Sequence, residues 1–469
     1  MNASEVVYKP VRQLAGLVRE RKVSPTELTE VFLERLERIG PSYNALVTLM
    51  PDRAMEEARR AEQELASGMY RGPLHGIPYG LKDLFAAVGA PTSWGATPFK
   101  DQVFEHDSTV ARKLNEAGAV LLGKLALVEI AGGIRYKQPN ATFTGPGINP
   151  WGGTTWAGGS SSGSGSAVSA GLAPFAIGSE TWGSIIMPSS NCGIAGLRPT
   201  YGRVSRAGGM PLSWTLDKPG PMCLTADDCG LVVEAIAGPD PNDLAATDRP
   251  FSYSRAPSDR RFKLGIPVGA TDDVEPTVEE NFEAALSALG SIADFEEVEL
   301  PDYPYGAVIT AIFMGESATI YSEFTRSGRS SELTAPEDRY GIYARSATLA
   351  TDYLRAMRIR KLIARDVDAI MSRYDALVGP GRPGVATPLD LDRVKSFKER
   401  SSDVMGALGN CIGLPSVTVP SGFSEDDLPT SIQFMGRPYD ENVILSVAAA
   451  YQSMTTWHER HPPDPEPIS

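Results

Sequence analysis

Cysteine and histidine are scarce in this sequence, with four residues of each type among 469. The cysteines are Cys192, Cys223, Cys229 and Cys411. They are too few for a disulfide scaffold and too irregularly spaced for a zinc site, so we expect reduced residues of the core. The histidines are His75, His106, His458 and His461. Because they form no HExxH or similar pair, we expect neither a metal nor another cofactor.

Positive charge and long apolar runs are also limited. The chain has 44 Lys and Arg residues against 58 Asp and Glu residues, which gives a net charge of −14. Binding of nucleic acid depends mainly on Lys and Arg, and no basic patch stands out, so we expect no direct contact with nucleic acid. No stretch reaches the roughly 18 apolar residues of a spanning helix, and the first residues lack the apolar run of a signal peptide. We therefore expect a cytoplasmic protein that does not bind membranes.

The pattern of apolar residues predicts an α/β protein. From Gly76 onward, short apolar runs broken by glycine and proline alternate with helical patterns. A helix is expected to begin at Ser24, because Ser24 and Glu27 can form a capping box. A long amphipathic helix is expected over about 351–373. Its expected apolar side consists of Leu354, Met357, Leu362, Val367 and Ile370.

The segment 158–171, GGSSSGSGSAVSAG, has the composition of a flexible linker. However, apolar sequence punctuated by glycine continues on both sides, over 172–177 and 194–197. No second domain therefore begins here. We interpret the segment as closely packed backbone around a site.

Three segments carry residues suited to nucleophilic chemistry. Lys82 lies among apolar residues in GIPYGLKDLF, and burial would lower its pKa enough to make it a base near neutral pH. The glycine-rich segment offers Ser160, Ser161 and Ser162, and a third segment places Ser184 directly after Gly183. A serine hydroxyl needs a base to take its proton, and the developing oxyanion needs backbone N–H donors, which an adjacent glycine brings close.

The order of these motifs resembles the amidase signature family, the Ser-cisSer-Lys hydrolases of amide bonds. The resemblance covers most of the chain and weakens between about 230 and 345. It is carried by residues 76–85, 107–131, 148–151 and 158–205, and by the C-terminal GLPSVTVPSGF and LPTSIQFMGRPYDE.

The resemblance implies a role for each candidate residue. Lys82 aligns with the base of the family, Ser160 with a bridging serine held by a cis peptide bond, and Ser184 with the nucleophile. Ser161 aligns with a serine that supports the bridge. The implied oxyanion hole consists of the backbone N–H groups of Thr181, Trp182, Gly183 and Ser184.

The function that follows is hydrolysis of a carbon–nitrogen bond in a small-molecule amide or carbamate (urethane) through a serine acyl-enzyme. The protein would act as a monomer or a homo-oligomer. One alternative is the glutaminase (A) subunit of a tRNA-dependent amidotransferase, whose partner subunit would contact the nucleic acid. Another is an inactive amidase-like binding protein.

The usual Asp-x-Gly-Gly-Ser-Ile-Arg of the family has become Glu180-Thr181-Trp182-Gly183-Ser184-Ile185-Ile186. Trp182 stands where glycine is common, and Ile186 stands where arginine is frequent. The backbone N–H of Trp182 can still donate, whereas its indole either narrows the pocket or packs beneath it. The loss of arginine removes any basis for transferring specificity from relatives that use it.

A different serine hydrolase would use Ser161 as the nucleophile, because residues 159–163 fit the G-x-S-x-G elbow of α/β-hydrolases. Its base would be His458 or His461. That elbow should follow a hydrophobic strand, but here it follows NPWGGTTWA. The run also lacks the GxGxxG and GK[ST] patterns of nucleotide sites.

The expected architecture is one large α/β/α domain over residues 1–469, with a central mixed sheet covered by helices on both faces. Within it we expect a helical N-terminal segment over 1–68 and a catalytic core over 70–225. Residues 226–345 would form a variable insert that covers and shapes the pocket, and residues 346–455 would complete the sheet.

Overall fold

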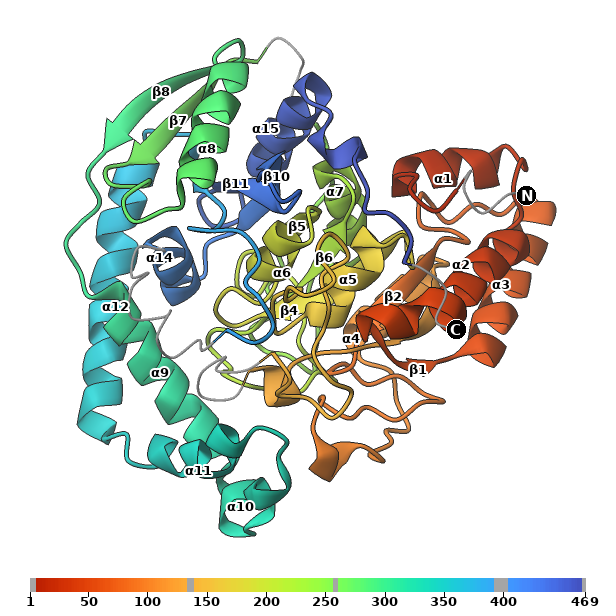
Figure 1. The fold of residues 1–469 in the computed structure, drawn as a ribbon, viewed down its shortest axis with the longest axis horizontal. Helices are drawn as coiled ribbons and strands as arrows, with labels where there is room; N and C mark the ends of the chain where they lie inside the picture. The colour runs from red at the N-terminus through yellow and green to blue at the C-terminus, as the bar shows by residue number, and fades with distance from the viewer. Residues whose placement is uncertain (1–5, 133–138, 256–259, 392–403, 466–469) are drawn as a thin grey trace.

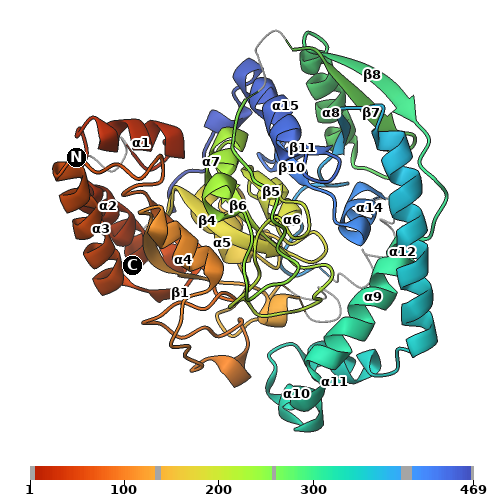
Figure 2. The same ribbon diagram turned by 180° about the vertical axis from the view of Figure 1, so that it is seen from behind.

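A single mixed sheet crosses the molecule in the computed structural model, which describes residues 6–132, 139–255, 260–391 and 404–465 (Figures 1 and 2). In sheet order, its eleven strands are β1 (Leu46–Leu49), β3 (Val120–Leu125), β2 (Pro78–Lys82), β4 (Phe175–Glu180), β6 (Lys218–Cys223), β5 (Ala195–Arg198), β10 (Ser416–Phe423), β11 (Pro429–Met435), β9 (Ala376–Pro380), β7 (Phe262–Pro267) and β8 (Ala293–Val298). Strand β2 runs parallel to β3 and β4, whereas β6 is antiparallel to β4 and β5. The predicted mixed sheet is confirmed.

Helices cover both faces of this sheet. They are α1 (Val11–Arg19), α2 (Pro25–Ile39), α3 (Pro51–Ala66), α4 (Thr109–Glu116), α5 (Ser162–Ser169), α6 (Ile186–Asn191), α7 (Ala226–Ile236), α8 (Pro276–Leu289), α9 (Tyr305–Ile320), α10 (Ser322–Arg326), α11 (Pro336–Arg345), α12 (Ala350–Met371), α14 (Val404–Ile412) and α15 (Glu441–Met454). Helices α5 and α6 pack on one face, and α4, α7 and α15 pack on the other. Helix α2 begins with the predicted capping box between Ser24 and Glu27.

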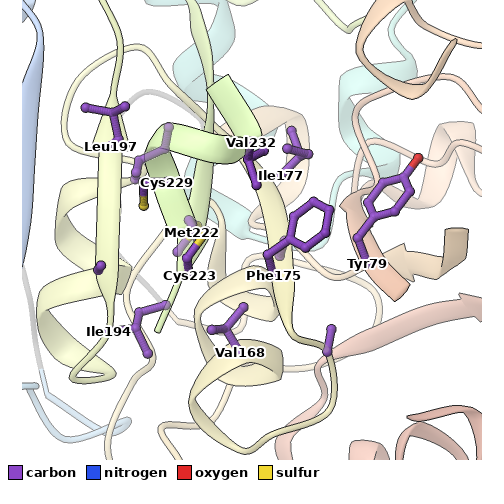
Figure 3. Close-up of a cluster of buried hydrophobic side chains, with 14 of the residues drawn as sticks. Tyr79, Val168, Phe175, Ile177, Ile194, Leu197, Met222, Cys223, Cys229 and Val232 are labelled. Carbon is purple, nitrogen blue, oxygen red and sulfur yellow. The ribbon is translucent and has the colours of Figure 1, made fainter. Parts of the chain in front are cut away.

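The core around β4 holds the strand that leads into the candidate site. In Figure 3, Phe175 and Ile177 of β4 lie near Cys229 and Val232 of α7, with Leu197 of β5 close by. All five side chains are buried. This packing fixes β4 between the two helical layers, so the residues that follow its last position, Glu180, have a defined place.

Helices α9 to α12 extend beside the sheet as an arm, in which α9 packs against α12 and α14 (Figure 1). The prediction for α12 was partly wrong. Leu354 and Leu362 are 60% and 42% exposed, and the buried side of the helix consists of Ala356, Ile363, Val367 and Met371.

Within the described ranges, none of the helices combines the length and apolar character that crossing a bilayer requires.

Candidate active site

Lys82 ends strand β2 and is completely buried. Its Nζ lies 2.7 Å from the Oγ of Ser160 and 2.9 Å from the Oγ of Ser161. Because β2 lies next to β4 in the sheet and α5 contacts both strands, the lysine at the strand end reaches the loop that precedes α5. The structure therefore brings together residues from two of the predicted segments.

Ser160 and Ser161 lie immediately before α5, and both are completely buried. The peptide bond between Gly159 and Ser160 is cis, as the resemblance implies. The backbone N–H of Ser161 donates to the carbonyl of Ser184 (3.4 Å). This bond places the serine pair directly beside the third segment.

Ser184 is buried in the turn that joins β4 to α6. Gly183 adopts a φ of +85°, a conformation that glycine reaches without a steric penalty. The carboxylate of Glu180 accepts the N–H groups of Ile185 and Ile186 at 2.9 and 3.0 Å, which fixes the far end of the turn. The backbone from residue 181 to 184, where the oxyanion hole is expected, lies between these anchors.

Ser179 is a member of the cluster that the sequence did not reveal. Its Oγ lies 3.0 Å and its carbonyl 3.4 Å from the Nζ of Lys82, and its carbonyl accepts the hydroxyl of Ser161 (3.2 Å). A neutral lysine has two N–H donors and one lone pair. If the two donors point to Ser161 and Ser179, the lone pair is left for the hydroxyl of Ser160.

The environment of Lys82 favours the neutral amine. Burial lowers its pKa well below the ordinary value, because the charged ammonium loses its hydration. The negative charges of Asp217 and Glu180 act in the opposite direction. Burial is the larger effect, so Lys82 can serve as a base near neutral pH.

A cleft of about 240 Å³ opens beside this cluster. Ser179 and Thr181 line it, which places the cleft next to the turn of Ser184. Much of its wall is apolar and includes Leu84, Phe85, Met210, Pro211, Leu212 and Trp214. An ion pair between Arg206 and Asp243 also lines it. Such a cleft suits a substrate with an apolar group and some polar substituents.

The indole of Trp182 packs against a second cluster of buried residues that includes Leu216 and Leu408. The lining of the cleft is supplied by other side chains. Of the two places that the sequence left open for this indole, the structure favours packing.

The contacts of Ser161 disfavour the alternative in which this serine is the nucleophile of an α/β-hydrolase. Its hydroxyl is bonded to Lys82 and Ser179. His461 instead stacks on Tyr8, with ring centroids 4.0 Å apart, and His458 lines a separate small pocket with it. Among the described residues, no group of three or more His, Cys, Asp or Glu side chains is placed to hold a metal ion.

The chain is similar to known proteins over nearly its whole length. The family model described as Amidase matches residues 27–445. The chain is 36% identical to the A subunit of the glutamyl-tRNA(Gln) amidotransferase of Methylococcus capsulatus, over 97% of this chain and 98% of that protein.

Two solved structures share the fold. The peptide amidase of Stenotrophomonas maltophilia superposes with a TM-score of 0.83 at 30% identity, over 98% of this chain and 99% of that one. A structure described as a vestigial protein complex that reveals the origins of an s-triazine catabolic enzyme gives a TM-score of 0.86 at 28% identity, over 95% and 98%.

Proposed function

Because the chain belongs to the amidase family, which the match over residues 27–445 shows, we propose that it hydrolyses a carbon–nitrogen bond through an acyl-enzyme on Ser184. One observation carries this proposal: the Nζ of Lys82 lies 2.7 Å from the Oγ of Ser160, and both groups are completely buried. The oxygens bonded to this Nζ belong to hydroxyl and carbonyl groups. A buried amine among uncharged partners is suited to accept a proton.

In the proposed reaction, Lys82 takes the proton of Ser160 while Ser160 takes the proton of Ser184. The Oγ of Ser184 then attacks the carbonyl carbon, and the carbonyl π electrons move onto its oxygen. Backbone N–H groups of residues 181–184 stabilise this oxyanion. The tetrahedral intermediate collapses when Ser160 returns a proton to the leaving nitrogen, because an amide expels its amine only after protonation.

Water completes the cycle by the reverse relay. It gives a proton to Ser160 as it attacks the acyl carbon, and the second tetrahedral intermediate releases the carboxylic acid. Ser184 regains its proton, and Lys82 returns to the neutral amine. The substrates compatible with this chemistry are carboxamides and, as a further proposal, carbamates.

A second candidate is the glutaminase step of an amidotransferase. The observation that favours it is the 36% identity to the A subunit of an amidotransferase over nearly the full length of both chains. Ammonia release from glutamine would use the same relay and the same acyl-enzyme. In that case the chain would act with a partner protein.

The test uses the purified full-length chain alone. It would be offered glutamine, an aryl amide, a peptide with an amidated C-terminus and an aryl carbamate, and covalent labelling by a fluorophosphonate would be followed by mass spectrometry. We expect turnover of at least one amide and labelling at Ser184. Activity confined to glutamine would favour the second candidate.

Two variants sharpen this test. Ser184→Ala should lose both turnover and labelling, while Ser190→Ala serves as the control. Ser190 is a buried serine of α6 that accepts a hydrogen bond from Ser431 (2.7 Å), so its loss removes a buried hydroxyl outside the relay. Wild-type turnover in Ser184→Ala would overturn the assignment, as would absence of both turnover and labelling in the wild type.

A further inference from the structure

Asp217 is a partly buried carboxylate that lines the cleft and joins its wall to the turn before Ser184. Its Oδ1 accepts the hydroxyl of Thr181 at 2.6 Å. Its Oδ2 accepts the backbone N–H groups of Leu212 and Ser213, both at 2.8 Å. This side chain immediately precedes β6, whose first residue pairs with Glu180 at the end of β4. One carboxylate thus binds two segments that meet beside the proposed nucleophile.

A second carboxylate, the completely buried Glu316 of α9, binds the same segment of the wall. It accepts the hydroxyl of Ser213 at 2.5 Å, and the N–H and hydroxyl of Thr215 at 3.1 and 2.8 Å. The hydroxyl of Tyr353 on α12 also donates to it (3.0 Å). A continuous set of hydrogen bonds therefore runs from the helical arm, through residues 212–217, to Thr181.

We propose that Asp217 is a positioning residue for the reaction, which fixes Thr181 so that the N–H groups of the turn point at the developing oxyanion. This inference rests on the proposed function, and in it Asp217 acts on the reaction through Thr181. Through Glu316, the arm formed by α9 and α12 sets the same geometry. The cleft wall and the oxyanion turn then behave as one unit.

The turn of residues 181–184 needs a hydrogen bond that fixes the end nearest β4. Glu180 fixes its far end through Ile185 and Ile186, but Gly183 has no side chain, and a Cβ built there would meet nothing within 4 Å. Donors contribute to catalysis only when they are already aimed at the place where charge develops. The bond between Thr181 and Asp217 supplies this orientation at the near end.

Asp217 also acts on Lys82 through its charge. Its carboxylate raises the pKa of Lys82, against the larger lowering caused by burial. Among the described residues, the charged or titratable groups Lys218, Arg206 and Tyr321 also interact electrostatically with Asp217. Removing the carboxylate charge would lower the pKa of Lys82 further, so the base would stay neutral to a lower pH.

The experiment compares Asp217→Asn, Thr181→Val and Thr181→Ser with the wild type on an amide that the wild type hydrolyses. Asparagine offers one acceptor oxygen, so one of the two segments would face an NH₂ donor. We expect kcat to fall about 10- to 100-fold in Asp217→Asn and Thr181→Val, with KM changing less, and to recover in Thr181→Ser. The double variant with Asp217→Asn and Thr181→Val should have a kcat no lower than that of the slower single variant.

The control is Asp228→Asn. Asp228 is a completely buried carboxylate of α7 that likewise accepts two backbone N–H groups, from Val11 and Arg12 at 3.0 Å, but these belong to the first turn of α1. It should keep the wild-type kcat even if its melting temperature falls. A matching fall in kcat for this control would indicate general destabilisation and overturn the proposal.

The pH profile distinguishes the effect of the Asp217 charge on Lys82 from the loss of the bond to Thr181. The acidic limb of kcat/KM reports the base of the free enzyme, so it should move to lower pH in Asp217→Asn and stay in place in Thr181→Val. A wild-type kcat in Thr181→Val, multiplying losses in the double variant, or an unmoved limb in Asp217→Asn would each overturn the inference. The proposed function would survive these outcomes if the wild type is still labelled at Ser184.

Discussion

At Lys82, two electrostatic effects oppose each other, and their balance decides the chemistry. Burial at the end of β2 lowers the pKa, whereas Asp217 and Glu180 raise it from a distance. The bonded partners of the amine are uncharged hydroxyl and carbonyl groups, so no adjacent ion pair holds the proton. The lysine can therefore exchange a proton with Ser160, which a lysine in a buried ion pair would resist.

Replacing Lys82 by arginine tests this balance. Arginine keeps the positive charge and cannot give up its proton, so we expect kcat/KM at pH 7 to fall about 1000-fold or more. In the wild type, kcat/KM should rise as pH passes upward through the lowered pKa of Lys82. Lys82→Arg should show no such rise when kcat/KM is measured between pH 5 and 9.

Lys113→Arg is the matched control for that measurement. Lys113 is a partly buried lysine of α4 whose Nζ donates to the carbonyl of Ala237 (2.7 Å), a bond that arginine can replace. This variant should keep the wild-type pH profile. A wild-type profile in Lys82→Arg would show that some other group acts as the base.

The sequence identified Lys82 and the serines because polar residues stand out in apolar or glycine-rich surroundings. Ser179 and Asp217 carried no such signal. Ser179 is one more small residue before Glu180, and Asp217 sits in a stretch that resembles an ordinary loop. Their importance comes from tertiary contacts with Lys82 and Thr181, which no local pattern encodes.

At the scale of secondary structure, most of the glycine- and serine-rich segment 158–171 forms helix α5 (Ser162–Ser169). All eight residues of α5 are buried, so the helix is part of the core and cannot act as a linker. A Cβ at Gly163 would lie 2.4 Å from the carbonyl oxygen of Ala45 and 2.5 Å from the backbone nitrogen of Ala126. Both atoms belong to backbone and cannot move aside cheaply.

We therefore predict that Gly163→Ala lowers the free energy of unfolding by about 2 to 4 kcal/mol, as overpacking of a rigid site does. Gly16→Ala is the control, because Gly16 lies within helix α1 and a Cβ there meets nothing within 4 Å. That change should raise stability by about 0.5 to 1 kcal/mol. Urea unfolding curves of the two variants would measure both effects, and equal stabilities would contradict this account of α5.

Helix α12 shows that the spacing of apolar residues can predict a helix without predicting which face is buried. Leu354 and Leu362, eight residues apart, form one apolar stripe, while Ala356, Ile363 and Val367 form another. Both stripes fit a helix, and the sequence does not state which one faces a partner. Packing against α9 buries the second stripe and leaves the two leucines exposed.

For the whole molecule, the pattern of residues predicted an α/β protein, and the resemblance supplied the mixed sheet between helical layers. The full order of strands could not be read from local sequence, because several neighbours in the sheet are distant in the chain. Strand β5, for example, pairs Arg198 with Ser416 of β10. The division into an N-terminal segment, a catalytic core, a covering insert and a C-terminal part remains a prediction.

The buried ion pair between Glu180 and Arg198 joins these distant parts. Arg198 donates to Glu180 (2.9 Å) from β5 and to the carbonyl of Leu414 (3.0 Å), and Asn410 of α14 donates to Glu180 (2.9 Å). Burial alone would raise the pKa of Glu180, but the charges of Arg198 and Lys218 and the backbone N–H groups lower it to about 2. The folded structure therefore stabilises the ionised form of the Glu180 carboxylate.

A group whose pKa is lower in the folded than in the unfolded state stabilises the fold above its unfolded value, and this contribution disappears as pH falls through the folded value. For Glu180 the interval runs from about 4.5 down to about 2. Protonation of Glu180 should contribute roughly 3 kcal/mol to the loss of stability on acidification.

Glu180→Gln should be less stable at pH 7 by about 3 to 5 kcal/mol, since Arg198 loses its charged partner. Urea unfolding at pH 7 and pH 3 should then show a smaller difference in Glu180→Gln than in the wild type. Asp294→Asn, which removes an exposed partner of Arg261, should keep the wild-type difference. Equal differences for Glu180→Gln and the wild type would show that the pair between β4 and β5 does not link acidification to unfolding.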